Sequence, residues 1–309
     1  GCEQGSLLSP ALFNIYVNNI PNLPSCHLAI FAYDTAILTK HKHPDIAVQA
    51  LQNYVSQLQP WLTDWKTKVN PSKCACLLFT KKRNMPILNP IQIFGQPVPF
   101  VSQYKFLGLI LDAKLNFDSH TQKAVTKAKN SSFTVGRLLA RKSTLAVKHR
   151  LLLYKAIVRT VILYGSPIWG TTSIRSLKKL QVFQNKQLVR IVDAPWYVRR
   201  KLIHQDLKID PVLDFMKIIS KKFFEKLQQI PNALLQLPPY DSAVPSSRKR
   251  PRAMLDYTYE NFPSIKRRRD VSTIAESLDP SFSSKFLCFG RFSPATLCNP
   301  RVYFRYLES

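Results

Sequence analysis

Apolar residues recur along this chain with two different spacings, and the change from one to the other predicts most of its secondary structure. Near the N-terminus they recur every three or four residues, which predicts a helix with one apolar stripe. Ser9 suits the N-cap of this helix, Pro10 suits its first turn, and Asn18–Pro21 suits its end. The stripe consists of Leu12, Phe13, Tyr16, Val17 and Ile20.

Two short β-prone runs then flank a polar centre. The runs Cys26–Ile30 and Ala36–Thr39 enclose Phe31–Thr35, and runs of this kind around a tight turn predict an antiparallel hairpin. Asp34 should place a carboxylate at the tip of the hairpin. A loop bounded by Gly1 and Gly5 precedes the first helix, so the pattern predicts a loop, a helix and a hairpin in that order.

Helical spacing returns over residues 46–65 and predicts an amphipathic helix, with a break near Pro60. The stretch Lys68–Lys73 is rich in turn residues, and the alternation from Cys74 to Thr80 predicts a strand. Cys74 and Cys76 then occupy two positions on one face of that strand, which we favour over a pair of metal ligands. The hairpin strands Ile91–Phe94 and Val98–Val101 follow, and Tyr104–Asp112 is predicted to form one further strand.

After Phe117 the pattern becomes helical and strongly basic. Residues 121–208 contain 19 Lys and Arg but only 2 acidic residues, Asp193 and Asp206. Beyond Pro238 and Pro239 the periodicity is lost, and we expect residues 241–309 to be mostly disordered. The predicted class is therefore α+β, with an antiparallel sheet and its helices followed by a helical region and a basic tail.

Charge and cysteine usage narrow the function classes. The chain carries 45 Lys and Arg against 18 Asp and Glu, a net charge of +27, which favours polyanionic partners, nucleic acid before a membrane surface. No apolar run approaches the roughly 20 residues of a membrane span. The 6 cysteines form no C-x-x-C pair, so we expect no zinc site and interpret them as reduced thiols of an intracellular protein. No defined protein partner follows from the sequence.

Two basic clusters mark the tail, residues 248–252 and 266–269. They suit a nuclear localisation signal or a nucleic-acid-binding arm. A solvated charge run without a dedicated role is an equal alternative. Since the chain begins at Gly1 and its first methionine is Met85, we interpret it as a fragment or a broken reading frame.

Several segments together resemble one family. They are the loop and helix Gly1–Asn14 with the string Gln4-Gly5-Ser6, the hairpin turn Phe31-Ala32-Tyr33-Asp34, the turn Asn70-Pro71-Ser72-Lys73, the strand Tyr104–Asp112, and the segments Leu153–Ile157, Leu163–Gly170 and Ile191–Val198. In this order they resemble the reverse transcriptases of jockey-type non-LTR (LINE-like) retrotransposons of insects over roughly residues 1–240. The resemblance implies a partial polymerase palm over residues 1–117, a basic helical thumb or connection region over 118–240, and a tail over 241–309.

The resemblance also implies residue roles. Gln4, Gly5 and Ser6 would contact the template and the incoming nucleotide, although Cys2 and Glu3 depart from the usual family residues. Lys73 would be a proton donor to pyrophosphate, with a solvated lysine as the equal alternative. The family hairpin reads aromatic-Ala-Asp-Asp, so Asp34 is the second of its two carboxylates and Tyr33 occupies the place of the first, a principal metal ligand.

The family reaction is nucleotide addition by an RNA-directed DNA polymerase, a nucleotidyltransferase that holds two Mg²⁺ ions between carboxylates. Tyr33 is a phenol that stays neutral at pH 7, the family's upstream aspartate strand does not precede the hairpin here, and Asp112 lies at the far end of another strand. We therefore predict that Mg²⁺ is not productively bound and that the chain is inactive. The alternatives are a non-catalytic module that binds RNA or DNA, and a non-functional remnant. Trp169, Trp196 and Tyr197 are expected to be core aromatics.

Overall fold

The chain folds into two compact units. A computed structural model describes residues 8–80, 88–140, 142–231 and 284–294. Unit 1 comprises residues 1–114 together with 273–309, and unit 2 comprises residues 115–272. The candidate residues Gln4, Gly5 and Ser6 and the two basic clusters of the tail lie outside the described residues.

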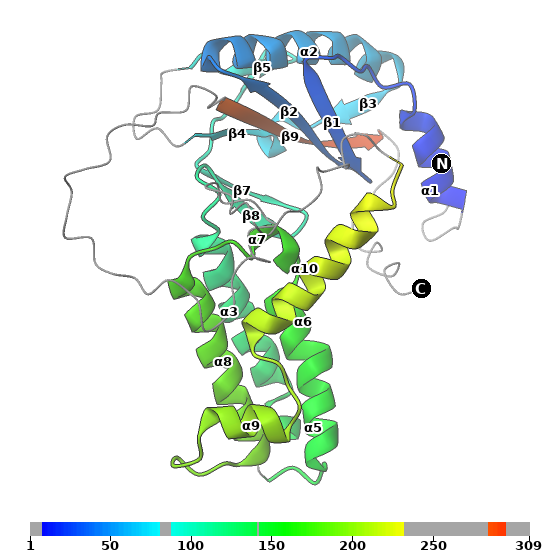
Figure 1. Cartoon of the computed structure of the whole chain (residues 1–309). Coiled ribbons are helices and arrows are strands. Elements are labelled where there is room, and N and C mark those ends of the chain that lie inside the picture. The colour runs from blue at the N-terminus through cyan, green and yellow to red at the C-terminus, as the bar shows by residue number, and fades with distance from the viewer. Residues whose placement is uncertain (1–7, 81–87, 141, 232–283, 295–309) are drawn as a thin grey trace, which may run out of the picture. The chain divides into compact units, whose positions relative to one another are not determined.

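Unit 1 contains an antiparallel sheet with the helix α2 (Pro44–Asp64) packed on one face (Figure 1). The strands are β1 (Cys26–Phe31), β2 (Asp34–His41), β3 (Thr67–Val69), β4 (Ala75–Phe79) and β9 (Ser284–Pro294). Their order is β1-β2-β9-β3, and β4 also pairs with β9. The mixture of helices and antiparallel sheets confirms the α+β class.

The core of unit 1 lies between α2 and the sheet. Leu51, Tyr54, Leu58 and Leu62 recur at helical spacing and are almost completely buried. The predicted break at Pro60 is wrong, because α2 continues through this residue. The apolar side chains on either side of Pro60 are buried in the core, and this packing outweighs the intrinsic cost of a proline within a helix.

The helix α1 (Leu8–Val17) precedes the hairpin, as the apolar stripe predicted. Ser9 lies within the helix rather than at its N-cap. Tyr16 of this helix donates a hydrogen bond to the carbonyl of Trp65, and its ring meets the Trp65 ring edge-on. These contacts attach α1 to the end of α2.

β9 is the main departure from the sequence prediction. It lies in the range 241–309, which we expected to be mostly disordered, and its 11 residues are an exception to this expectation. β9 fills the centre of the sheet, paired antiparallel with β2 on one side and with β3 and β4 on the other. The partners of β9 on both sides are remote from it in the sequence.

A pair of buried cysteines joins β9 to β4. Cys76 and Cys288 are directly opposite each other in the register, and their Sγ atoms lie 3.2 Å apart. The hydrogen bond to Cys76 and then burial raise the pKa of the Cys288 thiol well above its ordinary value. Both thiols are free, and the raised pKa keeps the Cys288 thiol protonated at neutral pH.

Two small hairpins complete unit 1. The strands β5 (Ile91–Ile93) and β6 (Gln96–Val98) turn at Phe94–Gly95, where both residues have positive φ. The single strand predicted over Tyr104–Asp112 is instead a hairpin of β7 (Gln103–Phe106) and β8 (Leu109–Asp112). Its turn, Leu107–Gly108, has the same pair of positive φ values, and Gly108 supplies the conformation that a two-residue turn requires.

Unit 2 is helical. Its elements are α3 (Asp118–Thr134), α4 (Gly136–Leu139), α5 (Val147–Leu153), the π-helical segment η2 (Tyr154–Arg159), α6 (Thr160–Leu163), α7 (Ser166–Trp169), α8 (Ile174–Val192), α9 (Arg200–Asp206) and α10 (Val212–Gln228). Within the unit, α3 packs against both α8 and α6 (Figure 1). No helix in the described ranges is both long and apolar enough to cross a membrane.

The aromatic residues of unit 2 divide into two groups. Trp169 is fully buried, which confirms its predicted place in the core. Trp196 and Tyr197 are 89% and 69% exposed, so the prediction that they are core aromatics is wrong. They lie in the connection between α8 and α9, where neither helix covers them.

Acid is expected to destabilise unit 2 through His120. Burial lowers the pKa of this side chain from 6.5 to about 4. The unfolded chain therefore binds the proton at a higher pH than the folded chain does. The stabilisation is complete above pH 6.5 and is lost as the pH falls towards 4. A shift of this size corresponds to about 2 kcal/mol after allowance for solvent screening.

Urea unfolding at a series of pH values measures this effect. A His120→Phe variant should lose less stability than the parent chain between pH 6.5 and 4, whereas His149→Gln, at an exposed position of the same unit, should follow the parent curve. Equal pH dependence in the parent and the His120→Phe variant would contradict the assignment.

Candidate functional site: the β1–β2 hairpin and the basic helices

The β1–β2 hairpin places Tyr33 and Asp34 at its tip. The strands pair from Cys26↔Thr39 to Phe31↔Asp34, so only Ala32 and Tyr33 lie in the turn. Ala32 has a φ of 49°, a conformation that residues other than glycine seldom adopt. The predicted hairpin is therefore confirmed, and its turn has the positive φ at the first central residue that tight hairpins use.

Tyr33 is held against the first helix. Its ring meets the ring of Phe13 in α1 at a centroid distance of 5.1 Å and an interplanar angle of 71°, an edge-to-face contact. The side chain is half-buried. Tyr33 therefore acts as a packing residue between the hairpin and α1, and an aspartate at this position could not make the same contact.

Asp34 begins β2, and its Cα partner in β9 is Arg291. The register thus places an arginine position opposite the remaining carboxylate position of the hairpin.

The donor set at the hairpin does not fit a magnesium ion. Mg²⁺ takes six oxygen ligands in octahedral geometry and favours carboxylates. Here one carboxylate, Asp34, lies beside a phenol and opposite an arginine position. In the described part of the chain, no three His, Cys, Asp or Glu side chains come together as a group that could hold a metal.

Lys73 lies in another part of the sheet. It ends the 3₁₀ turn η1 (Pro71–Lys73), in which the Asn70 side chain accepts a hydrogen bond of 3.0 Å from the backbone N–H of Ser72. The Lys73 side chain is exposed. Since η1 leads into β4, and β9 separates β4 from β2, one strand lies between the elements that carry Lys73 and Asp34.

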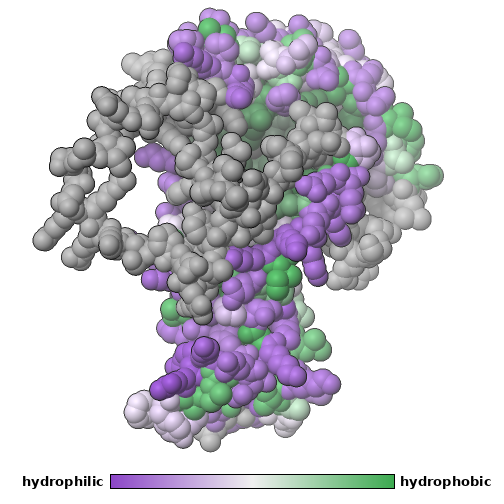
Figure 2. Space-filling view, viewed as in Figure 1, coloured by the Kyte–Doolittle hydropathy of each residue, from purple (hydrophilic) through white to green (hydrophobic). Residues whose placement is uncertain are grey.

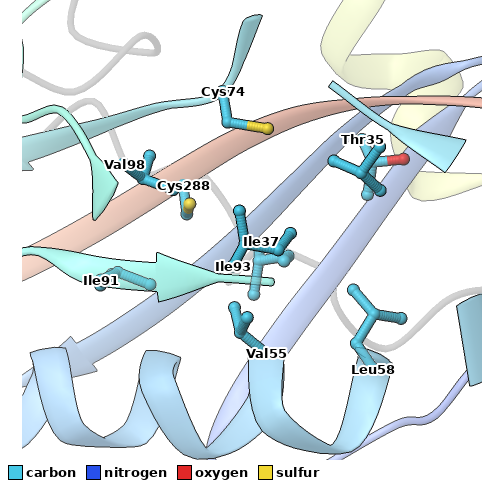
Figure 3. A pocket seen from close by; sticks show the side chains of 10 residues that line it. Thr35, Ile37, Val55, Leu58, Cys74, Ile91, Ile93, Val98 and Cys288 are labelled. Atoms are coloured by element: carbon cyan, nitrogen blue, oxygen red, sulfur yellow. The ribbon is translucent and has the colours of Figure 1, made fainter. Parts of the chain in front are cut away.

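Behind the hairpin tip, Thr35 lines a small cavity of about 20 Å³ between α2 and the sheet (Figure 3). Figure 3 shows Val55 and Leu58 rising from α2 towards Ile37 and Ile93. The Thr35 hydroxyl is buried, with no hydrogen-bond partner within the described structure. A buried hydroxyl without a partner destabilises the folded state by about 1 to 3 kcal/mol.

Thr35→Val is therefore expected to raise the free energy of unfolding of unit 1 by about 1 kcal/mol, because it removes this hydroxyl and keeps the shape of the side chain. Thr39→Val is the matched control. Thr39 is equally buried, but its hydroxyl donates a 3.1 Å hydrogen bond to the Ser25 carbonyl, so this variant should lose about 1 kcal/mol. Denaturant unfolding measures both, and a destabilised Thr35→Val variant would refute the assignment.

The cations of unit 2 form two groups. The smaller group makes contacts within the fold, although Arg190 in it is itself exposed. Arg190 donates to the Gly136 carbonyl at 2.9 Å, Arg150 donates to the Ala140 carbonyl, and the Arg159 guanidinium lies 3.9 Å from the centre of the Phe215 ring. The larger group is exposed to solvent: Lys123, Lys127, Lys129, Arg137, Lys142, Lys148, Arg175, Lys178, Lys179, Lys186, Arg199, Arg200, Lys201, Lys208, Lys221, Lys222 and Lys226. Figure 2 shows hydrophilic residues over most of the visible face of α10.

A polar hollow of about 410 Å³ lies where α3 meets the start of α8. Asp118 accepts hydrogen bonds of 2.7 Å from the hydroxyls of Ser173 and Ser176. Arg175 and Lys179 also line the hollow. The hydrogen bonds attach the start of α8 to the start of α3, and both cations are exposed.

Comparison with known proteins identifies the class. Residues 1–111 match the family described as reverse transcriptase (RNA-dependent DNA polymerase). The RNA-directed DNA polymerase from mobile element jockey of Drosophila funebris is 33% identical over 264 residues, 82% of this chain and 28% of the relative. The corresponding jockey protein of Drosophila melanogaster is 31% identical over 242 residues, 76% of this chain and 26% of the relative.

A third relative, the probable RNA-directed DNA polymerase from transposon BS of Drosophila melanogaster, is 31% identical over 237 residues, 74% of this chain and 26% of the relative. No solved structure matches the chain. The chain belongs to the reverse transcriptases of jockey-type non-LTR retrotransposons. It spans about a quarter of the length of these relatives.

Two features of the site were not predicted from the sequence. The pairing of Arg291 with Asp34 depends on β9, and the local pattern around residues 284–294 is too short to reveal its partners. The exposure of Trp196 and Tyr197 did leave a signal, because three cations follow them in Arg199, Arg200 and Lys201. Adjacent aromatic and basic residues are typical of nucleic-acid-binding surfaces.

Proposed function

We propose that this chain binds the template–primer duplex of RNA and DNA through the exposed cations of unit 2, and that it does not catalyse nucleotide addition by itself. The observation that supports this binding is the large group of exposed lysines and arginines in unit 2. Their side chains form no part of the core, whereas Arg150, Arg159 and Arg190 are used within the fold. Phosphate contacts of this kind supply most of the affinity in sequence-independent nucleic acid binding.

The second half of the proposal rests on the hairpin. Catalysis by the family requires carboxylates that hold two metal ions. Tyr33 replaces one of them by a phenol that packs against Phe13, and β9 brings Arg291 opposite the other. Gln4, Gly5 and Ser6 retain their proposed role at the template and the nucleotide, and Lys73 its proposed role as a proton donor in the intact family.

The salt dependence of binding tests the first half. Fluorescence anisotropy with a blunt RNA–DNA duplex should show affinity falling steeply with salt, with a log–log slope of about −0.9 for each phosphate contacted. The double variant Lys123→Gln/Lys127→Gln removes two exposed charges one turn apart on α3. It should flatten the slope by up to about 2, because each lost phosphate contact removes about 0.9.

The matched control is Lys40→Gln/Lys42→Gln, which removes the same charge from exposed positions of unit 1 and should leave the slope unchanged. A slope near zero, or no binding at low salt, would overturn the proposal. A non-functional remnant is the alternative, and a chain without a cooperative thermal transition would favour it.

A further inference from the structure

The connection between α8 and α9 presents two large aromatic side chains to solvent. Trp196 and Tyr197 are 89% and 69% exposed, and their rings meet edge-on at 6.0 Å. They occupy the two central positions of a turn in which the Val198 N–H donates to the Pro195 carbonyl at 3.2 Å. Aromatic side chains of this size are usually more buried, and an adjacent exposed pair is typical of a binding surface.

Both ends of this connection are fixed. α8 ends at Val192 and is capped by Asp193 in a left-handed conformation, and the Ala194 N–H donates to the Val189 carbonyl. The His204 ring of α9 lies 2.8 Å from the Asn185 side chain of α8 and 2.9 Å from the Ile209 carbonyl. These contacts hold α9 against α8, so the aromatic pair is presented by a preorganised loop.

The charges around the pair favour an anionic ligand. Arg199, Arg200 and Lys201 follow one residue later and are all exposed, while Asp193 is the nearest acid in the sequence. An aromatic face beside cations recognises an unpaired nucleobase by stacking and its phosphates by charge. Within a duplex each internal base is stacked on both faces, so this arrangement suits a single-stranded segment better than a paired one.

We propose that Trp196 is a stacking platform for an unpaired base of the bound nucleic acid, with Tyr197 buttressing its edge and Arg199, Arg200 and Lys201 contacting the adjacent phosphates. The site rests on the proposed nucleic acid binding of unit 2 and adds to it the single-stranded part of the ligand. A membrane surface is the competing occupant for exposed tryptophan beside cations, but the family of the chain and the absence of an apolar helix face in this loop favour nucleic acid.

The test uses the full chain and two probes, a blunt RNA–DNA duplex and the same duplex with a single-stranded overhang carrying 2-aminopurine. Trp196→Ala should weaken binding of the overhang probe about 5- to 100-fold, the range expected for one lost stacking contact, and change blunt-duplex binding less than twofold. Quenching of the 2-aminopurine on binding should be lost as well. Trp196→Phe should restore most of both signals.

Phe133→Ala is the matched control, because Phe133 is an 86% exposed aromatic residue of the same unit that lies outside the connection between α8 and α9. Equal effects of Trp196→Ala and Phe133→Ala on the overhang probe would overturn the site. So would a Trp196-dependent association with anionic phosphatidylserine vesicles that leaves both nucleic acid probes unaffected. If the parent chain binds neither probe, the proposed function fails and the site falls with it, whereas intact blunt-duplex binding with no effect of Trp196→Ala removes the site alone.

Discussion

Primer extension by this chain is expected to remain at background with Mg²⁺ and all four deoxynucleotides. The reaction needs a cluster of carboxylate oxygens that can neutralise the metal ions and the developing phosphate charge. The hairpin offers Asp34 alone, next to Tyr33 and opposite Arg291 in the strand register. Losing about 4 kcal/mol of transition-state stabilisation already slows a reaction about a thousandfold, and we expect at least this loss.

Tyr33→Asp should not restore activity on its own. It recreates the two adjacent carboxylates of the family hairpin, but it also removes the edge-to-face contact with Phe13 and leaves the arginine position opposite Asp34 unchanged. Extension should therefore remain at background, and the variant should unfold at a lower denaturant concentration than the parent chain does.

Two further variants separate activity of the chain from contamination. Asp34→Asn removes the hairpin carboxylate, and Asp112→Asn removes one at the end of β8, on a separate two-stranded sheet. Extension that requires Asp34 but not Asp112 would refute the proposed inactivity. Extension that is insensitive to both variants indicates a contaminating polymerase.

The helices and strands that were predicted correctly are those whose apolar spacing is visible within a short stretch of sequence. The helix α2 displays its buried stripe at helical spacing, and the hairpin around Tyr33 joins two short β-prone runs through a tight turn. In both, the residues that define the element are within a few positions of one another. The candidate carboxylate Asp34 could therefore be placed at a hairpin tip from the sequence alone.

The errors share a different cause. β9 pairs with strands more than 200 positions away in the chain, and no local pattern can show which remote edge a short apolar run will meet. The β7–β8 hairpin was not predicted, because its turn Leu107–Gly108 contains one glycine and lies within a mostly apolar run. A single glycine in such a run does not by itself indicate a turn. Trp196 and Tyr197 were assigned to the core by residue type, although burial depends on what packs against a loop.

Replacing Trp169 by alanine is expected to destabilise unit 2 by about 4 kcal/mol. The side chain is fully buried, and its indole N–H donates a 2.7 Å hydrogen bond to the Tyr164 carbonyl. Its ring lies 5.3 Å from the His120 ring, and α10 packs against the short helix α7 that carries it. Truncating a large buried aromatic residue leaves a cavity that rigid neighbours cannot fill, which typically costs 3 to 5 kcal/mol.

Trp196→Ala is the matched control for this stability prediction, since it removes the same side chain from an exposed loop and should change the free energy of unfolding by less than about 0.5 kcal/mol. Trp169→Phe keeps most of the ring volume and loses the N–H, so it should fall between the two. Urea titration followed by far-ultraviolet circular dichroism measures all three. A loss below 1 kcal/mol for Trp169→Ala would mean that the helices of unit 2 move into the vacated space. Trp169 would then not organise the helical core that supports the exposed cations and the Trp196 loop.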